Sequence, residues 1–191
     1  IFERFEDFGL DVWYQNINST IVNVLGKRTG NKFPNQYVII CAHYDDMPSG
    51  STAPGADDNA SGTAAVIEAA RLMSGLNLPY TILFAAWDEE ERGLYGSKAY
   101  ADSAYVHGDS IIAVLNFDMI AYDGNNDGGL DINTDPASMP LAVEFKQVVN
   151  LYQPSLVPQI TTSLNGGSDH QSFQQKGFKA ILSIEDNNDF T

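Results

Sequence analysis

The stretch that decides the fold is Ile82-Leu83-Phe84-Ala85-Ala86-Trp87-Asp88-Glu89-Glu90-Glu91. Its first six residues are apolar, and an apolar run of this length predicts a buried β-strand. The run ends in adjacent carboxylates, whose burial at the end of a strand is unfavourable unless a cation lies beside them. A metal ion is the natural counter-charge. The stretch therefore predicts a core strand with a metal site at its carboxyl end.

Metal-ligating side chains also follow two other apolar runs. His43 and Asp45 come after one run, and Asp118 comes directly after another. Between them lies the loop segment 54–62, which contains Asp58. In open α/β sheets, ligands collect outside the carboxyl ends of the strands, so we expect these side chains to meet at one edge of the sheet.

Predicted strands and helices alternate along the chain. The patterns predict strands over 20–25, 37–42, 81–87, 111–117, 130–134, 157–161 and 180–184, and helices over 60–72, 93–104, 138–151 and 169–176. Residues 1–16 suggest the end of a helix that leads into a loop, 26–36 a turn-rich connection, and 44–59 a long functional loop. This alternation predicts an α/β fold, a three-layer α/β/α sandwich with a central, mostly parallel mixed sheet.

Composition narrows the classes of function. The chain has 191 residues, which suits one domain, 1–191, with a full core. Its net charge of −15 argues against nucleic acid as a partner and against a polybasic membrane patch. No apolar run approaches the roughly 20 residues of a membrane span, so we expect no membrane insertion. The single cysteine, Cys41, lies in a predicted strand and is expected to be a buried thiol.

The motifs together resemble a known family, the co-catalytic dizinc aminopeptidases of the leucine aminopeptidase type that bacteria secrete. The same fold carries relatives of glutamate carboxypeptidase and glutaminyl cyclase. The resemblance covers nearly the whole chain, and it lies in the order and spacing of His43-Tyr44-Asp45, Pro54 to Gly62, Glu90 to Ser97, Asn116 to Met119 and Ser168-Asp169-His170.

The resemblance implies a set of zinc ligands. Asp58 would bridge two zinc ions, His43 and Asp118 would complete the protein ligands of one ion, and Glu91 would bind the other. These residue types agree with the preference of zinc for nitrogen and carboxylate oxygen. The family also implies a cis peptide bond between Asp58 and Asn59.

The resemblance implies catalytic and supporting roles as well. Glu90 would act as the general base on a metal-bridging water and return the proton to the leaving amine. Asp45 would orient His43 and fix its tautomer. Asp169 and His170 would line the substrate pocket or support the residues that do so.

One expected ligand is absent from the sequence. In the family, the histidine of the second metal follows the last core strand, but this chain ends at Thr191, and its histidines are His43, His107 and His170. Either a substitute ligand is recruited or the ligand lies beyond Thr191. We expect truncation at the carboxyl end, and the start at Ile1 likewise suggests a piece of a longer precursor. His107 is expected at the surface.

A second acidic segment, Asp123 to Asp131, resembles the start of a calcium-binding loop, with oxygen donors at alternate positions. The twelfth position of such a loop carries Glu, but here it is Thr134, and no helices are predicted beside the segment. The sequence therefore favours a plain turn.

Three functions follow as hypotheses. The first is a zinc aminopeptidase that removes N-terminal residues, preferably apolar ones, from peptides. The second is a single-zinc glutaminyl cyclase, and the third is a catalytically incomplete binding domain of the same fold. The complete set His43, Asp58, Glu91 and Asp118 favours the first, as does the presence of Glu90. The resemblance also implies a secreted or periplasmic bacterial protein.

Overall fold

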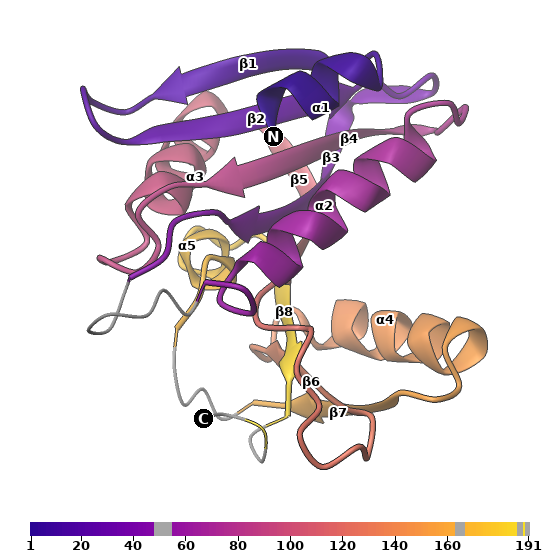
Figure 1. Ribbon diagram of the computed structural model, residues 1–191. Coiled ribbons are helices and arrows are strands. Elements are labelled where there is room, and N and C mark those ends of the chain that lie inside the picture. The colour runs from indigo at the N-terminus through magenta and orange to yellow at the C-terminus, as the bar shows by residue number, and fades with distance from the viewer. Residues whose placement is uncertain (48–54, 163–166, 187–188, 190–191) are drawn as a thin grey trace.

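The computed structural model describes residues 1–47, 55–162, 167–186 and 189 (Figure 1). The elements in chain order are α1 (Phe2–Asp7), β1 (Asp11–Asn16), β2 (Val22–Arg28), β3 (Phe33–His43), α2 (Ala60–Met73), β4 (Tyr80–Trp87), α3 (Tyr95–His107), β5 (Ser110–Phe117), β6 (Gly129–Thr134), α4 (Met139–Tyr152), β7 (Val157–Thr161), α5 (His170–Gln174) and β8 (Ala180–Glu185). Every strand and helix predicted from the sequence is present within a few residues of its expected bounds. The predicted loop 44–59 is described only at 44–47 and 55–59.

The strands form a single mixed sheet in the order β1-β2-β4-β3-β5-β8-β6-β7. The central strands β4, β3, β5 and β8 run parallel to one another. On one side β2 pairs antiparallel with β4, and β1 antiparallel with β2. On the other side β6 pairs antiparallel with β8, and β7 parallel with β6. The predicted α/β class with a mixed, mostly parallel sheet is confirmed.

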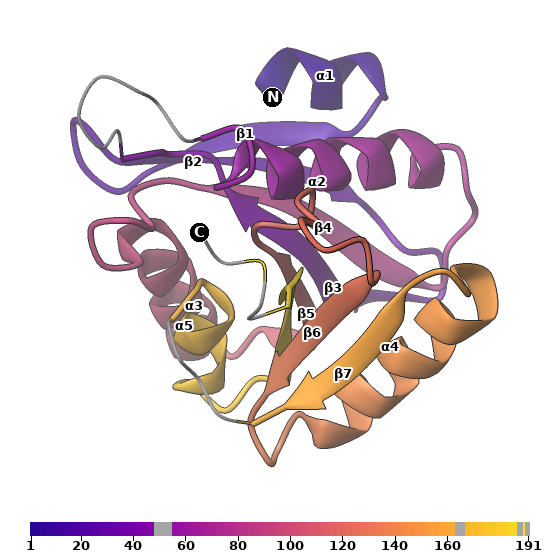
Figure 2. The ribbon, with the colours of Figure 1, turned by 60° about the horizontal axis from the view of Figure 1, so that its bottom comes forward.

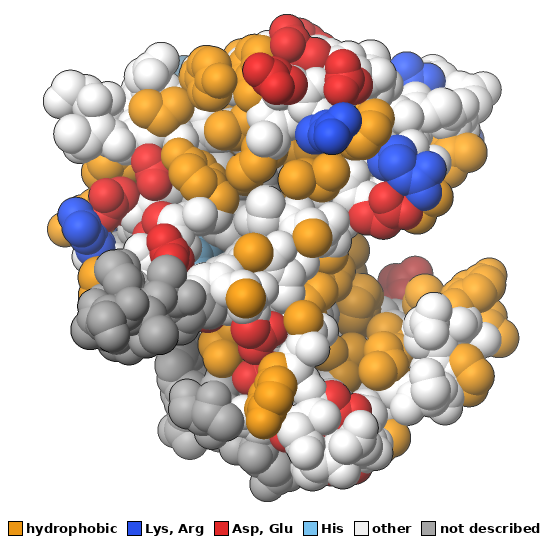
Figure 3. Space-filling view, in the orientation of Figure 1, with side chains coloured by type: hydrophobic (Ala, Val, Ile, Leu, Met, Phe, Trp, Pro, Cys, Tyr) orange, Lys and Arg blue, Asp and Glu red, His pale blue; other side chains and the backbone are white. Residues whose placement is uncertain are grey.

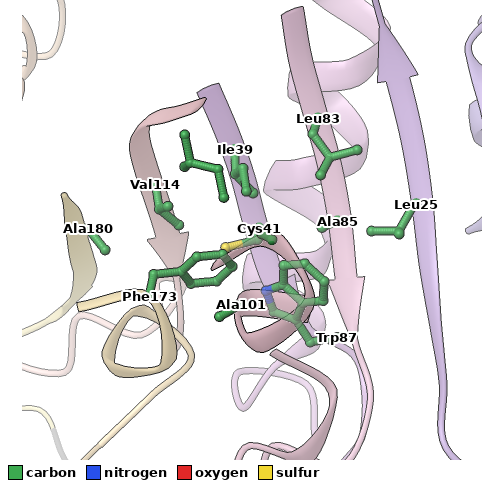
Figure 4. Close-up of a cluster of buried hydrophobic side chains, with 12 residues drawn as sticks. Leu25, Ile39, Cys41, Leu83, Ala85, Trp87, Ala101, Val114, Phe173 and Ala180 are labelled. Atoms are coloured by element: carbon green, nitrogen blue, oxygen red, sulfur yellow. The ribbon is translucent and has the colours of Figure 1, made fainter. Parts of the chain in front are cut away.

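Helices cover both faces of the sheet, which gives the expected three layers (Figure 2). Successive residues of β3 point to opposite faces. Ile40 packs in a cluster with Val66 of α2, whereas Cys41 belongs to the cluster formed with α3 and α5. Figure 4 shows Cys41 beside Trp87 and Phe173 on that second face. Cys41 is fully buried, as its place in the strand predicted.

Two predictions near the amino terminus were wrong. Residues 11–16 form strand β1 rather than a loop, and the turn-rich connection 26–36 shortens to the few residues between β2 and β3. β1 is an edge strand with mixed exposure, so its apolar periodicity is weak. Gly26 suggested a turn, but it lies beneath the ring of Phe5, where a Cβ would come within 2.7 Å of the ring.

The parallel strands bring four chain segments to one edge of the sheet. β3 ends at His43, β4 at Trp87, β5 at Phe117 and β8 at Glu185. Because these strands are parallel neighbours, the residues that follow them lie at the same edge. Among the described helices, none has the length and apolar character needed to cross a membrane.

Candidate metal centre

Three predicted ligands meet at this edge. His43 Nε2 lies 3.2 Å from Asp58 Oδ1 and 3.3 Å from Asp118 Oδ1. The three residues each offer a ligand atom within 4.8 Å of the other two. In the metal-free protein, burial lowers the pKa of His43, but hydrogen bonds to the surrounding carboxylates outweigh burial and raise it far above its usual value. One imidazole and two carboxylates at this spacing fit a zinc ion.

Local structure holds these ligands in place. His43 is the last residue of β3, and Asp118 follows β5. The peptide bond between Asp58 and Asn59 is cis, so that expectation is confirmed. Asn59 caps α2 by accepting a 2.9 Å hydrogen bond from Gly62 N–H, and its amide donates to the carbonyl of Phe117 at 3.0 Å. The segment before α2 is thereby fixed against the end of β5.

Asp45 connects His43 with the acidic turn after β4. Its backbone oxygen lies 3.1 Å and its Oδ1 3.4 Å from His43 Nδ1. Its carboxylate also accepts backbone N–H hydrogen bonds from Glu90 at 3.0 Å and from Glu91 at 3.2 Å. Burial raises the pKa of Asp45, but the hydrogen bonds from His43 and the backbone outweigh it and keep the pKa below its usual value. Asp45 is thus held as a carboxylate.

Glu90 and Glu91 lie in the same turn but in different surroundings. Burial raises the pKa of Glu90 to about 8, and the most influential charge on it is Asp169. The pKa of Glu91 is also raised, first by burial and then by the charge of Asp58. The close group of possible ligands at this edge consists of His43, Asp58 and Asp118, and Glu91 stays outside it.

Asp169 and His170, at the start of α5, are both fully buried. Burial raises the pKa of Asp169 to about 7. It lowers the pKa of His170 to about 4, with the charge of Asp135 acting weakly in the opposite direction. His107 is exposed at the end of α3, where the sequence placed it.

Two hydroxyl groups that support the ligands escaped the sequence reasoning. Ser168 Oγ donates a 2.6 Å hydrogen bond to Asp118 Oδ2 and accepts one from the amide of Asn116 at 2.8 Å. Thr63 Oγ1 donates to the backbone oxygen of His43 at 2.8 Å. Ser168 lies beside Asp169 in a motif recognised from the sequence. However, nothing in the spacing connects it with Asp118, which lies 50 residues away.

A cavity of about 270 Å³ lies between α4 and the end of β5, lined by apolar side chains such as Phe117, Phe145 and Val149. Figure 3 shows it as a hollow with hydrophobic walls beside α4. His43, Asp58 and Asp118 are not among the described residues that line it. The cavity is therefore separate from the ligand cluster.

A mixed α/β sheet with imidazole and carboxylate groups gathered at its carboxyl edge defines a class of metal-binding α/β proteins. Residues 23–190 match Peptidase family M28, and the chain belongs to this family. It is 33% identical over 196 residues to "Leucine aminopeptidase 1" of Trichoderma harzianum, covering 94% of this chain and 46% of that protein. It is 29% identical over 208 residues to "Probable zinc metalloprotease" of Pyrenophora teres f. teres, covering 90% and 43%.

Solved structures share the fold. An aminopeptidase from Aneurinibacillus sp. strain AM-1 is 29% identical with a TM-score of 0.69, over 87% of this chain and 39% of that one. The LapA structure of Legionella pneumophila reaches a TM-score of 0.84 at 23% identity, over 99% and 55%. The glutaminyl cyclase of Fimbriiglobus ruber reaches 0.78 at 19% identity, over 96% and 73%. The last two show the fold alone. The chain spans less than half the length of the curated relatives above.

Proposed function

We propose that this chain forms the catalytic part of a zinc-dependent aminopeptidase that removes the N-terminal residue of peptides. The observation that carries the proposal is the cluster of His43, Asp58 and Asp118 in a member of Peptidase family M28, with the half-buried Glu90 close enough for His43 and Asp118 to influence its pKa. The similarity to aminopeptidases of Trichoderma harzianum and Aneurinibacillus supports the aminopeptidase class.

His43, Asp58 and Asp118 would hold one zinc ion, and Asp58 with Glu91 would contribute to a second. Bound zinc would polarise the scissile carbonyl and lower the pKa of the attacking water. The pKa of Glu91 in the metal-free protein is raised by burial and then by the charge of Asp58, which fits this arrangement. A cation placed between two such carboxylates would relieve their repulsion.

Glu90 would move the proton. Its pKa of about 8 in the metal-free protein comes mainly from burial, and a nearby cation would lower it toward neutrality. A base with a pKa near the working pH can accept a proton from water and then release it to the leaving amine. Asp45 would hold the His43 ring and the backbone of Glu90 in fixed positions relative to each other, since it contacts both.

Hydrolysis of leucine-p-nitroanilide by the zinc-loaded protein tests this proposal. Glu90→Gln should retain the zinc content of the wild type and lower kcat by about 10²–10⁴-fold, the usual contribution of a general base. Glu89→Gln is the matched control, because Glu89 lies in the same turn and its carboxylate forms an ion pair with Arg92. Equal loss of activity in both variants, or none in Glu90→Gln, would rule out the role of Glu90.

Glutaminyl cyclisation is the second candidate. The shared fold with a glutaminyl cyclase favours it, as does the close group of His43, Asp58 and Asp118, which leaves Glu91 outside. Conversion of an N-terminal glutamine peptide to pyroglutamate, with one zinc ion per chain and no release of p-nitroaniline, would select the cyclase. Zinc binding without either reaction would select the catalytically incomplete binding domain.

A location outside the cytoplasm is also part of the proposal. It is supported by the resemblance to aminopeptidases that bacteria secrete. Immunodetection in culture medium, periplasm and cytoplasm of the source organism would test it, and protein confined to the cytoplasm would contradict it.

A further inference from the structure

A second group of carboxylates lies apart from the ligand cluster. Asp123 and Asp127 are in the loop between β5 and β6, and Asp189 follows β8. Each offers an oxygen within 4.8 Å of the other two. Gly124 N–H donates a 2.9 Å hydrogen bond to Asp189 Oδ1, which fixes the two chain segments side by side at the bottom of Figure 1. Within the described parts of the chain, no Lys or Arg forms an ion pair with the three aspartates.

Asp189 provides an independent sign of a missing partner. Its residue is 3% exposed, and among the described residues its Oδ2 has no hydrogen-bond partner. A buried carboxylate oxygen without a partner is strongly unfavourable. Two further carboxylates in contact range increase this cost through repulsion. A cation among the three would remove both penalties.

The loop itself has the form of a cation-binding segment. Asp123, Asn125, Asp127 and Gly128 match the spacing D-x-[DN]-x-[DN]-G that begins a calcium loop. Gly128 has φ +70°, the left-handed conformation of the sharp turn at the sixth position. Asp123 accepts backbone N–H hydrogen bonds from Asp127 at 3.1 Å and from Gly128 at 3.2 Å. These bonds curl the loop around its carboxylates.

The sequence favoured a plain turn because the twelfth position, Thr134, carries no carboxylate. In the structure Thr134 is the last residue of β6, whereas Asp189 approaches the loop from the end of β8. We propose that Asp123, Asp127 and Asp189 bind a calcium ion, with Asp189 replacing the missing loop carboxylate. An all-oxygen set of hard ligands favours Ca²⁺ over zinc, which prefers imidazole nitrogen or thiolate.

Calcium at this place would connect the segments that follow β5 and β8. Both segments also contact the chain before Asp58, since Ala121 N–H donates a 2.9 Å hydrogen bond to Asp57 Oδ1. At the end of β8, burial and then the nearby Asp57 carboxyl group raise the pKa of Glu185 to about 8. The ion would therefore stabilise the frame around the zinc ligands without contacting them, and its binding does not depend on the proposed aminopeptidase activity.

Isothermal titration of the zinc-loaded protein with calcium chloride tests the site. We expect one Ca²⁺ per chain with a dissociation constant of about 10⁻⁴ M, the range of extracellular modules with few carboxylates. At a calcium concentration about ten times this dissociation constant, the midpoint of thermal unfolding should rise by roughly 3–6 °C. Tb³⁺ should replace Ca²⁺ and luminesce on excitation of the neighbouring Tyr122.

Variants locate the ion. Asp127→Asn and Asp189→Asn should weaken calcium binding at least tenfold. Glu144→Gln, which removes an exposed carboxylate from α4, should leave it unchanged. Asp127 is exposed, so its variant stays informative even where the variant of buried Asp189 fails to fold. About 10 mM calcium is well above the dissociation constants of extracellular calcium-binding modules, so no binding at this concentration would overturn the proposal. A calcium affinity of Asp127→Asn equal to that of the wild type would also overturn it.

Discussion

Asp45 accepts a 3.0 Å hydrogen bond from the backbone N–H of Glu90, and the same carboxylate lies 3.4 Å from the ring of His43. One side chain therefore contacts both a candidate ligand from β3 and the candidate base after β4. These two strands are hydrogen-bonded neighbours, with His43 opposite Trp87 in the register. The distance between ligand and base is thus set by the sheet and by one carboxylate.

Replacing Asp45 by Asn should disturb both partners. An amide carries no charge to support the imidazole, and its NH₂ group cannot accept one of the two backbone hydrogen bonds that Glu90 and Glu91 donate to separate carboxylate oxygens. We expect zinc affinity to fall about 10–100-fold, measured by competition with a chromophoric chelator. Asp46→Asn is the control, because Asp46 is exposed. Equal zinc affinity in the Asp45 variant and the wild type would show that Asp45 does not support the ligand.

Ser168→Ala should weaken the support of Asp118. The variant removes the 2.6 Å hydrogen bond to Asp118 and leaves the buried Asn116 amide without its acceptor. We expect a loss of about 1–3 kcal/mol in the free energy of unfolding, measured by urea denaturation, together with weaker zinc binding. Ser110→Ala, at the exposed start of β5, should change neither quantity. A variant as stable as wild type would contradict the proposed support.

Gly62→Ala should separate α2 from β5. A Cβ at this position would collide with the carbonyl oxygen of Phe117 and the side-chain oxygen of Asn59. The Asn59 oxygen cannot withdraw without breaking the cap of α2, and the Phe117 oxygen cannot withdraw without losing the hydrogen bond from the Asn59 amide. We therefore expect destabilisation of about 1–3 kcal/mol in thermal unfolding. Gly75→Ala is the control, since a Cβ there meets no atom within 4 Å. Equal melting midpoints for both variants would refute the packing argument.

His170 should make stability depend on pH. Burial lowers its pKa from 6.5 to about 4, so its stabilising effect is complete above pH 6.5. Below that pH the unfolded state binds a proton that the folded state does not, and stability falls until about pH 4. Between pH 7 and pH 5 the loss should be about 2 kcal/mol.

Urea unfolding of the metal-free protein at both pH values measures this effect. Removal of zinc prevents metal release from adding to the pH dependence. His170→Gln should lose less stability than the wild type over the same interval, because Gln does not titrate. The same dependence in both proteins would show that other groups cause it. His107→Gln, an exposed histidine, should behave like the wild type.

Much of the fold followed from local patterns. The apolar runs of β3, β4 and β5 are buried between helix layers, so their composition identified them directly. β1 was missed because an edge strand with one solvated face carries little apolar signal. The turn predicted at Gly26 was wrong for a related reason. Its close approach to the Phe5 ring is a contact with another element of the fold, which no local pattern reports.

The sequence alone determined which chemical groups follow the central strands, because His43, Glu90, Glu91 and Asp118 each come after an apolar run. It could not determine which of them come within ligand distance. The register of the parallel strands and the cap of α2 decided that His43, Asp58 and Asp118 meet more closely than Glu91 does.

The tertiary structure alone also paired Ser168 with Asp118, and Asp189 with the loop that contains Asp123. Ser168 and Asp118 are 50 residues apart along the chain. Asp189 and the Asp123 loop follow β8 and β5, which pair as parallel neighbours. Spacing along the sequence reports on contacts within one helix, strand or turn. Contacts between such distant segments depend on the order of strands in the sheet, which no local pattern contains.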